Sequence, residues 1–189
     1  SKNALFRLFT NGVATNRDEW VYDFDKKVLE KKSEFLVDVF NESIQKNEII
    51  DTIKWSDSLK DNFKKKNKSK FEKKKIIKSE YRPFSGNFYF SDKVFSDRLT
   101  QNHYDIYGQS LDKENIEIKF AFNEQTPLVL LAVNKVSDLN FCARGGTGFP
   151  LYKYDAGGNK HHNITDWGLS QFTSHYQDSA ITKEDIFYY

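Results

Sequence analysis

The sequence predicts a mixed α+β fold, with a mostly antiparallel central sheet and helices toward both ends of the chain. Near the start, one long stripe of apolar residues recurs at three- and four-residue spacing, which is typical of an amphipathic helix. Short alternating or continuous apolar segments, typical of strands, fill the middle. Helix-capping signals return near the end. Segregation of helices and strands along the chain indicates the α+β class.

The first predicted elements are two short strands and a long helix. ALFRLF (4–9) and EWVYDF (19–24) are the strands, joined as a hairpin or as near neighbours by the polar stretch 10–18. Asp25 is the predicted cap of a helix over Lys26–Lys46. The apolar face of this helix comprises Val28, Leu29, Phe35, Leu36, Val39, Phe40 and Ile44.

A second helix is predicted after its cap Ser56, and we expect a basic helical segment over 56–80. The following YRPF (81–84) breaks the helix, because the residue before proline is driven out of the helical region. Tyr81 and Phe84 beside the rigid Pro83 are expected to anchor a chain reversal, with Phe84 contributing strongly to stability if its ring is buried. A short strand, NFYF (87–90), follows.

Three further strands are predicted before the last helices. NIEIKFAF (115–122) alternates, with Ile116, Ile118, Phe120 and Phe122 on one side and Glu117 and Lys119 on the other. PLVLLAV (127–133) is predicted as a buried strand and DLNFCA (138–143) as another. Capping boxes at Asn163/Asp166 and Thr182/Asp185 predict the closing helices.

The composition suits one domain over residues 1–189, which we expect to be a fragment of a larger protein because the chain lacks methionine. Aromatic residues make up 16% of the chain and must build much of the core. Cys142 is the single cysteine, so disulfides and cysteine metal clusters are excluded. No apolar run approaches the roughly 20 residues that span a bilayer. We therefore expect a cytoplasmic protein with no membrane partner.

Catalytic and cofactor motifs are missing, so we expect no catalysis, no cofactor and no metal in this chain. The sequence has neither a P-loop nor a GxGxxG motif, and no histidine spacing typical of zinc. GGTG (145–148) could hold a phosphate through backbone N–H groups, but a plain loop explains it more simply. His161 and His162 are adjacent and point differently, so a surface loop is favoured over a metal site.

Positive charge is concentrated in one stretch, the lysine segment (60–78). It holds ten lysines against two carboxylates, a balance of +8, whereas the rest of the chain balances at −6. The segment is either a solvated surface or a surface that contacts DNA phosphates, and the two interpretations have similar weight. The polar stretch around Asn16 and Arg17 is either a wide structural turn or a recognition loop, because Asn and Arg also read base edges.

The order of short motifs carries a resemblance. NGVATNRDEWVYDF, IKWSDSLK, YRPF, NFYF, FPLYKY, NITDW and ITKEDIFYY together resemble the C-terminal part of Type ISP-like single-polypeptide restriction–modification enzymes, which are helicase and N6-adenine methyltransferase fusions. The resemblance implies a bacterial target-recognition region that binds double-stranded DNA and presents it to the methyltransferase. Bases would be read from the stretches 91–115 and 134–148.

Two functions therefore stand beside each other: DNA target recognition, and a coupling domain between helicase and methyltransferase parts that does not bind DNA. For the first, the candidate DNA-contacting residues are Lys64, Lys65, Lys66, Lys68, Lys70, Lys73, Lys74, Lys75, Asn16, Arg17, Arg98, Arg144 and Lys160.

Overall fold

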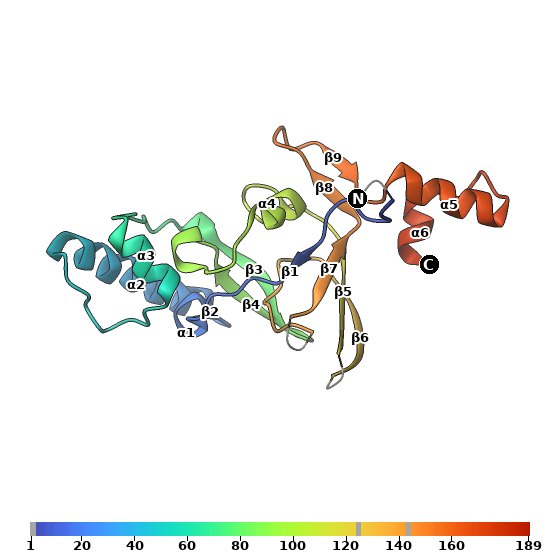
Figure 1. Cartoon of the computed structure of the whole chain (residues 1–189). Helices are drawn as coiled ribbons and strands as arrows, with labels where there is room; N and C mark the ends of the chain where they lie inside the picture. The colour runs from blue at the N-terminus through green and yellow to red at the C-terminus, as the bar shows by residue number, and fades with distance from the viewer. Residues whose placement is uncertain (1–2, 124–125, 143–144) are drawn as a thin grey trace. The chain divides into compact units, whose positions relative to one another are not determined.

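A computed structural model describes residues 3–123, 126–142 and 145–189 (Figure 1). Its helices and antiparallel sheets confirm the mixed α+β class. The strands form three separate sheets among the described residues, where the sequence predicts one central sheet. The chain divides into two compact units: a terminal unit, Ser1–Gly12 with Thr100–Tyr189, and a central unit, Val13–Leu99.

The central unit packs helices against a small antiparallel sheet of order β2-β4-β3. Its elements are α1 (Asp18–Val21), β2 (Tyr22–Asp23), α2 (Lys26–Lys46), α3 (Asp57–Lys64), η1 (Lys73–Lys75), β3 (Ile76–Arg82), β4 (Ser85–Phe90) and η2 (Lys93–Phe95). Aromatic rings hold the core together: the ring centroids of Phe40 and Phe95 are 5.4 Å apart, and those of Tyr22 and Tyr89 are 4.8 Å apart. The expected aromatic core is thus present.

Helix α2 has the bounds that the sequence predicts, and both ends have a local cause. The Asp25 carboxylate accepts hydrogen bonds from the backbone N–H groups of Lys27 and Val28, and Asn47 ends the helix in the left-handed conformation. Leu29, Leu36 and Phe40 are buried as expected. Val39 and Ile44 are buried as expected too, whereas Val28 and Phe35 are exposed, because the buried stripe also includes Ser33, Val37 and Ser43.

Both strands predicted at the N-terminus are wrong in extent. ALFRLF forms only a single bridge, Phe6 to Ile164, and the first strand, β1, is Thr10–Asn11. EWVYDF is split between the short helix α1 and strand β2. In α1, Trp20 stacks on Phe35 with ring centroids 5.8 Å apart, so packing on α2 decides the local conformation over strand propensity.

The basic helical segment predicted over 56–80 is helical in only two pieces. Helix α3 is capped by Ser56 as expected but ends at Lys64. The chain then passes through the 3₁₀ turn η1 and enters strand β3 at Ile76. Ile76 and Ile77 are buried in the sheet, and that burial outweighs the helix propensity of the lysines.

Phe84 is not a buried anchor. It lies in the turn between β3 and β4, 97% exposed, with a positive φ of 62°. Replacing Phe84 by Ala therefore disturbs no core packing, and we expect its effect on stability to stay within about 0.5 kcal/mol. Thermal unfolding of the variant would check this, and a loss of several kcal/mol would contradict the exposed position.

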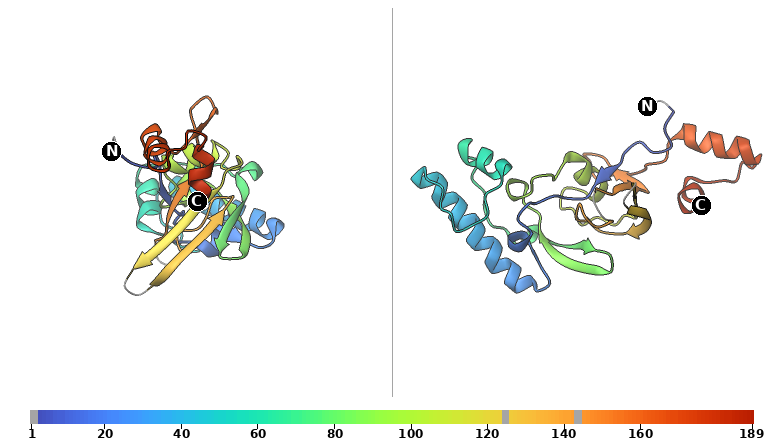
Figure 2. Two further views of the ribbon diagram at one scale, coloured as in Figure 1. Left: turned by 90° about the vertical axis from the view of Figure 1, so that its right-hand side faces the viewer. Right: turned by 60° about the horizontal axis from the view of Figure 1, so that its bottom comes forward.

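The terminal unit contains a four-stranded antiparallel sheet of order β1-β7-β5-β6 and a two-stranded sheet, β8-β9. Its further elements are α4 (Gln101–Tyr107), β5 (Glu117–Asn123), β6 (Thr126–Val133), β7 (Thr147–Pro150), β8 (Tyr152–Tyr154), β9 (Lys160–His162), α5 (Asp166–Tyr176) and α6 (Lys183–Tyr188). Strand β7 pairs with β5 only over Glu117–Phe120, so beyond that point β5 and β6 continue as a two-stranded ribbon (Figure 2).

The alternation in β5 is as predicted, but the buried side is the opposite one. Glu117 and Lys119 are buried and form an ion pair of 3.0 Å, whereas Phe120 and Phe122 are exposed. Gly148 of β7 lies opposite Lys119 and makes room for the pair: a Cβ atom there would lie 1.9 Å from Glu117 Oε1. Gly148, the last residue of GGTG, is therefore needed for packing against Glu117 and Lys119.

Other expectations for this unit are corrected as well. PLVLLAV forms β6, but Leu128 and Leu130 are each 62% exposed, so the strand is not fully buried. In the predicted strand DLNFCA, residues 139–142 instead form a turn in which Phe141 and Cys142 are buried, and residue 143 lies outside the described residues. Thr165 caps α5, while the buried Asn163 instead bonds to the backbone of Leu8 and Pro150. The capping box of Thr182 and Asp185 at α6 is confirmed.

His103 in α4 is buried and bonded as a neutral ring. Its Nδ1 lies 3.1 Å from the backbone N–H of Thr100, which must donate to it, and its Nε2 lies 3.0 Å from the carbonyl oxygen of Asn11. Protonation would place two N–H groups against each other. Burial above all, and then the charge of Lys119, lower the pKa of His103 from 6.5 to about 4.

This lowered pKa predicts acid sensitivity of the terminal unit. Between pH 6.5 and 4 the unfolded state binds a proton at His103 that the folded state does not, so stability falls as pH falls, by about 3 kcal/mol in full. Replacing His103 by Gln should remove that part of the pH dependence, measured by denaturant unfolding from pH 7 to pH 4. His175→Gln, at an exposed position of α5 in the same unit, is the control for the loss of a histidine ring.

No helix among the described residues has the length and apolarity that crossing a bilayer requires.

Candidate nucleic-acid interface

The polar stretch that contains Asn16 and Arg17 takes part in a network of hydrogen bonds and an ion pair within the central unit. Arg17 has no exposed surface. Its guanidinium donates to the carbonyl oxygen of Phe95 at 2.6 Å and to the Ser56 hydroxyl, and pairs with Asp97 at 3.2 Å. Burial lowers the pKa of Arg17, and Asp97 opposes that shift. The arginine thus ties the start of the unit to the segments before α3 and after η2.

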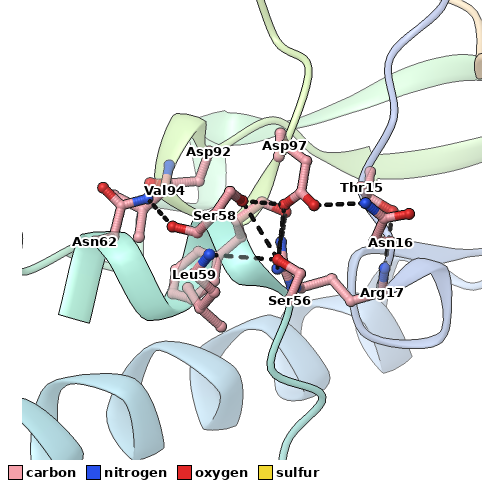
Figure 3. A network of polar contacts seen from close by, with 12 residues as sticks. Thr15, Asn16, Arg17, Ser56, Ser58, Leu59, Asn62, Asp92, Val94 and Asp97 are labelled. Carbon is pink, nitrogen blue, oxygen red and sulfur yellow. Dashed lines mark hydrogen bonds and ion pairs between the residues drawn. The ribbon is translucent and has the colours of Figure 1, made fainter. Parts of the chain in front are cut away.

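Asp97 is the acceptor at the centre of this network (Figure 3). Asn16, Ser56 and Ser58 all donate hydrogen bonds to its carboxylate, in addition to the ion pair with Arg17. Burial by itself would raise the pKa of Asp97. The hydrogen bonds from Ser58 and Asn16 and the charge of Arg17 outweigh that effect, so the pKa lies below 3.8. The carboxylate is therefore ionised and compensated.

These contacts explain why so many polar residues gather near position 16. Thr15 donates to Asp18, whose other carboxylate oxygen accepts from the Tyr81 hydroxyl at 3.0 Å. The stretch satisfies buried polar groups that would otherwise be costly. The prediction that Arg17 contacts DNA is corrected: its buried guanidinium is structural. Asn16 is exposed, but its amide is bound to Asp97.

Half of the predicted DNA-contacting lysines of the lysine segment are already paired with carboxylates of the protein. Lys64 pairs with Asp61, Lys73 with Glu30, Lys74 with Glu72, and Lys75 with both Glu72 and Asp92. The Lys75–Asp92 contact is 2.7 Å long and half-buried, so it fixes η1 against the end of β4. These lysines are partly neutralised within the fold.

The other four lysines, Lys65, Lys66, Lys68 and Lys70, are exposed, and within the described residues no carboxylate lies within 4 Å of their ammonium groups. They lie in the irregular stretch between α3 and η1, where the backbone is not committed to a regular element. Their charges are free to meet an external anion.

A groove of about 670 Å³ opens beside this stretch. We call it the lysine groove, and its lining comprises Ser58, Asn62, Lys66, Asn67, Lys68, Lys93, Val94, Ser96, Asp97 and Leu99. Lys93 comes from η2, so the groove joins two segments that lie apart in the sequence. The one acidic residue in this lining is Asp97, and the positive charge of Arg17 compensates its negative charge. The lining therefore presents a net positive charge.

The structure describes two of the three remaining predicted contact residues. Arg98 is exposed in the central unit, and Lys160 is exposed in the terminal unit, where its ammonium lies 3.8 Å from the ring centroid of Tyr152. Arg144 lies outside the described residues. His161 and His162 face different carboxylates, Asp155 and Glu184. No group of three metal-ligating side chains occurs in the described part of the chain.

Sequence reasoning missed Lys93 and Asp97. Both sit in a short polar stretch with no motif, and only the folding of 92–99 against α3 places them at the groove. A sequence signal for Lys93 was absent, because a single lysine among mixed residues does not stand out in composition.

Three solved structures of proteins in complex with DNA or a DNA substrate mimic are similar to this chain. The DrdV–DNA complex superposes with a TM-score of 0.89 at 29% identity and covers 97% of this chain and 19% of that one. The DNA-bound Type ISP restriction-modification enzyme LlaBIII matches with a TM-score of 0.84 and 24% identity, and the match covers 98% of this chain and 13% of LlaBIII. A nuclease-deletion mutant of the Type ISP enzyme LlaGI, in complex with a DNA substrate mimic, matches with a TM-score of 0.78 and 20% identity. That match covers 88% of this chain and 17% of the LlaGI chain.

The chain belongs to the family of Type ISP C-terminal specificity domains, whose model matches residues 4–189. This confirms the resemblance read from the sequence. The chain spans less than a fifth of the length of each of these three solved chains. No curated protein matches it.

Proposed function

We propose that this chain recognises duplex DNA as the specificity domain of a longer restriction–modification enzyme and presents the target to a methyltransferase part of that enzyme. The observation that carries the proposal is the family match together with 29% identity, over 97% of this chain, to DrdV, which was solved in complex with DNA. No catalytic role is assigned to the chain itself.

The charge distribution supports a two-part division of labour. Free lysines between α3 and η1 hold phosphates, which positions the domain without reading sequence. Side chains from loops supply sequence readout, and the stretches 91–115 and 134–148 are the proposed source, because they lie between the motifs that carry the family resemblance.

A coupling role is the second candidate, and one observation favours it. Phe120 pairs with Leu130 across β5 and β6, and Phe122 and Leu128 continue the same face toward the hairpin end; all four side chains are exposed. Contiguous exposed apolar surface typically marks a protein contact. The two roles can coexist, since the apolar face belongs to the terminal unit and the lysines to the central unit.

A salt titration of the 189-residue chain with random-sequence duplex DNA tests the proposal. We expect non-specific binding with a Kd of about 10⁻⁴ to 10⁻⁶ M near physiological salt, weakening linearly in log affinity against log salt. A flat titration at low salt would sink DNA recognition by this chain and favour the coupling role.

The paired and unpaired lysines give an internal comparison. Replacing Lys65, Lys66, Lys68 and Lys70 by Gln should flatten the log–log slope by about 0.9 for each phosphate that these lysines neutralise in the wild type. The same change at Lys64, Lys73, Lys74 and Lys75 should flatten it less, because an ion pair inside the protein already occupies each ammonium. Equal flattening in both variants would show that intramolecular pairing does not govern binding to phosphates.

A further inference from the structure

We propose that the lysine groove is a built binding site for a phosphate group of the DNA backbone, held by Lys66, Lys68 and Lys93. This inference deepens the proposed function and rests on it. It assigns a defined pocket and adds Lys93, which lies outside the lysine segment. Three observations carry it: the set of free donors, the compensated carboxylate and the backbone conformation of Lys66.

The donors that remain available in the groove are almost all cationic. The Ser58 hydroxyl is committed to Asp97, and the Ser96 hydroxyl lies 2.5 Å from the Tyr89 hydroxyl. Lys66, Lys68 and Lys93 have no carboxylate within ion-pair distance in the described part of the chain. Three lysines without a carboxylate partner line one cavity, and their positive charges attract an anion and repel a cation.

The groove's carboxylate does not oppose an anion. Asp97 is held from the inner side by Arg17 at 3.2 Å and by hydrogen bonds from Asn16, Ser56 and Ser58 (Figure 3). Its charge is therefore balanced before any ligand arrives. The three lysines remain in excess, and phosphate is the anion that a DNA-binding domain meets at highest density.

The backbone at Lys66 is the most specific feature. Helix α3 ends in a Schellman motif: the N–H of Lys66 donates to the carbonyl of Phe63 at 2.9 Å, and the N–H of Asn67 donates to the carbonyl of Asn62 at 3.0 Å. Lys66 occupies the left-handed position of this motif, with φ of 55°, where glycine is usual. A lysine at this position is conformationally strained, and it places a positive charge at the groove.

Lys66→Gly separates stability from binding. Glycine fits the left-handed position, so the melting temperature should rise by about 2–4 °C while the log–log slope of DNA binding flattens by about 0.9. Lys66→Arg keeps the positive charge and should therefore bind DNA with the wild-type log–log slope. Asn47→Gly, the same backbone change at the end of α2, should leave DNA binding unchanged. A Lys66→Gly protein that binds DNA with the wild-type slope would overturn the assignment.

Lys93→Gln separates a built groove from a diffuse lysine segment. The groove predicts a slope flattened by about 0.9, although Lys93 lies 15 residues beyond that segment. Lys60→Gln, an exposed lysine of α3 that does not line the groove, is the control and should have no effect. If wild type binds duplex and Lys93→Gln matches it, the groove is overturned while DNA recognition stands.

Inorganic phosphate distinguishes the source of the anion. Titration of the wild-type chain, followed by NMR shifts of backbone amides 62–68 and 93–97, should show binding that competes with duplex DNA. A chain that binds phosphate in the groove but binds no duplex would overturn the assignment to the DNA backbone together with the proposed function. Absence of both responses would overturn the site altogether.

Discussion

Replacing Arg17 by Met is expected to lower the free energy of unfolding of the central unit by about 3 kcal/mol at pH 7. Breaking one side of a buried ion pair typically costs about 3–5 kcal/mol because the other charge is left uncompensated. The lower end applies here, since the Asp97 side chain is 11% exposed and retains the hydrogen bonds of Asn16 and Ser58. Denaturant unfolding followed by the fluorescence of Trp20 and Trp55, both in this unit, would measure the loss.

The pH dependence identifies the mechanism. Asp97 has a folded-state pKa below its unfolded value of 3.8, so its contribution to stability is present above that value and is lost as pH falls through the folded pKa. Without Arg17 the carboxylate loses its main opposite charge. The difference between wild type and Arg17→Met should therefore shrink at acid pH, where Asp97 takes up a proton and needs no partner.

Two further variants control the Arg17 result. Arg98→Met makes the same substitution at an exposed arginine and should change stability by no more than about 0.5 kcal/mol. Adding Asp97→Asn to Arg17→Met removes the uncompensated charge and should recover part of the loss. A destabilisation by Arg17→Met that Asp97→Asn deepens would show that weakened packing, rather than charge, is the cause.

Replacing Lys119 by Met should destabilise the terminal unit by about 3–5 kcal/mol. The side chains of Glu117 and Lys119 are 1% and 2% exposed, so the remaining carboxylate could not reach water. Among the described residues, the partner that remains for it is the Tyr107 hydroxyl, 2.8 Å from Glu117 Oε2. Hydrogen exchange of the amides of β5 and β7, measured by NMR, localises the loss to this sheet.

The paired variant tests whether charge is the cause. Glu117→Gln combined with Lys119→Met leaves a neutral side chain beside Tyr107 and should be clearly more stable than Lys119→Met alone. Lys153→Met, at a partly exposed lysine of β8, should stay within about 0.5 kcal/mol of wild type. If Lys119→Met unfolds no more easily than Lys153→Met, the ion pair contributes nothing to the sheet.

Local rules were sufficient wherever a short stretch specifies its own structure. The stripe from Leu29 to Ile44 and the cap Asp25 predict α2 to the residue, and Ser56 and Thr182 predict the starts of α3 and α6. These elements depend on side-chain periodicity and on hydrogen bonds within one turn. The order of short motifs also carries the family, which the match over residues 4–189 confirms.

Burial could not be predicted where alternation alone was available. The pattern of β5 separates Glu117 and Lys119 from Phe120 and Phe122, but a period of two does not say which face is covered. The pair is buried because Gly148 leaves space opposite Lys119 and Tyr107 supplies a hydrogen bond. The continuous apolar run of β6 likewise does not say which face is covered: sequence places Leu128 and Leu130 inside, and the structure places them outside.

The α+β class, the main helix with its caps, the family and the concentration of positive charge in residues 60–78 all follow from the amino-acid sequence. The roles of the charged residues follow only from the folded chain. Arg17 is drawn into the interior by Asp97, Lys75 is taken up by Asp92, and Lys93 joins Lys66 and Lys68 around one groove. A charge acts on whatever lies within a few ångströms, and these neighbours come from segments that lie far apart in the sequence.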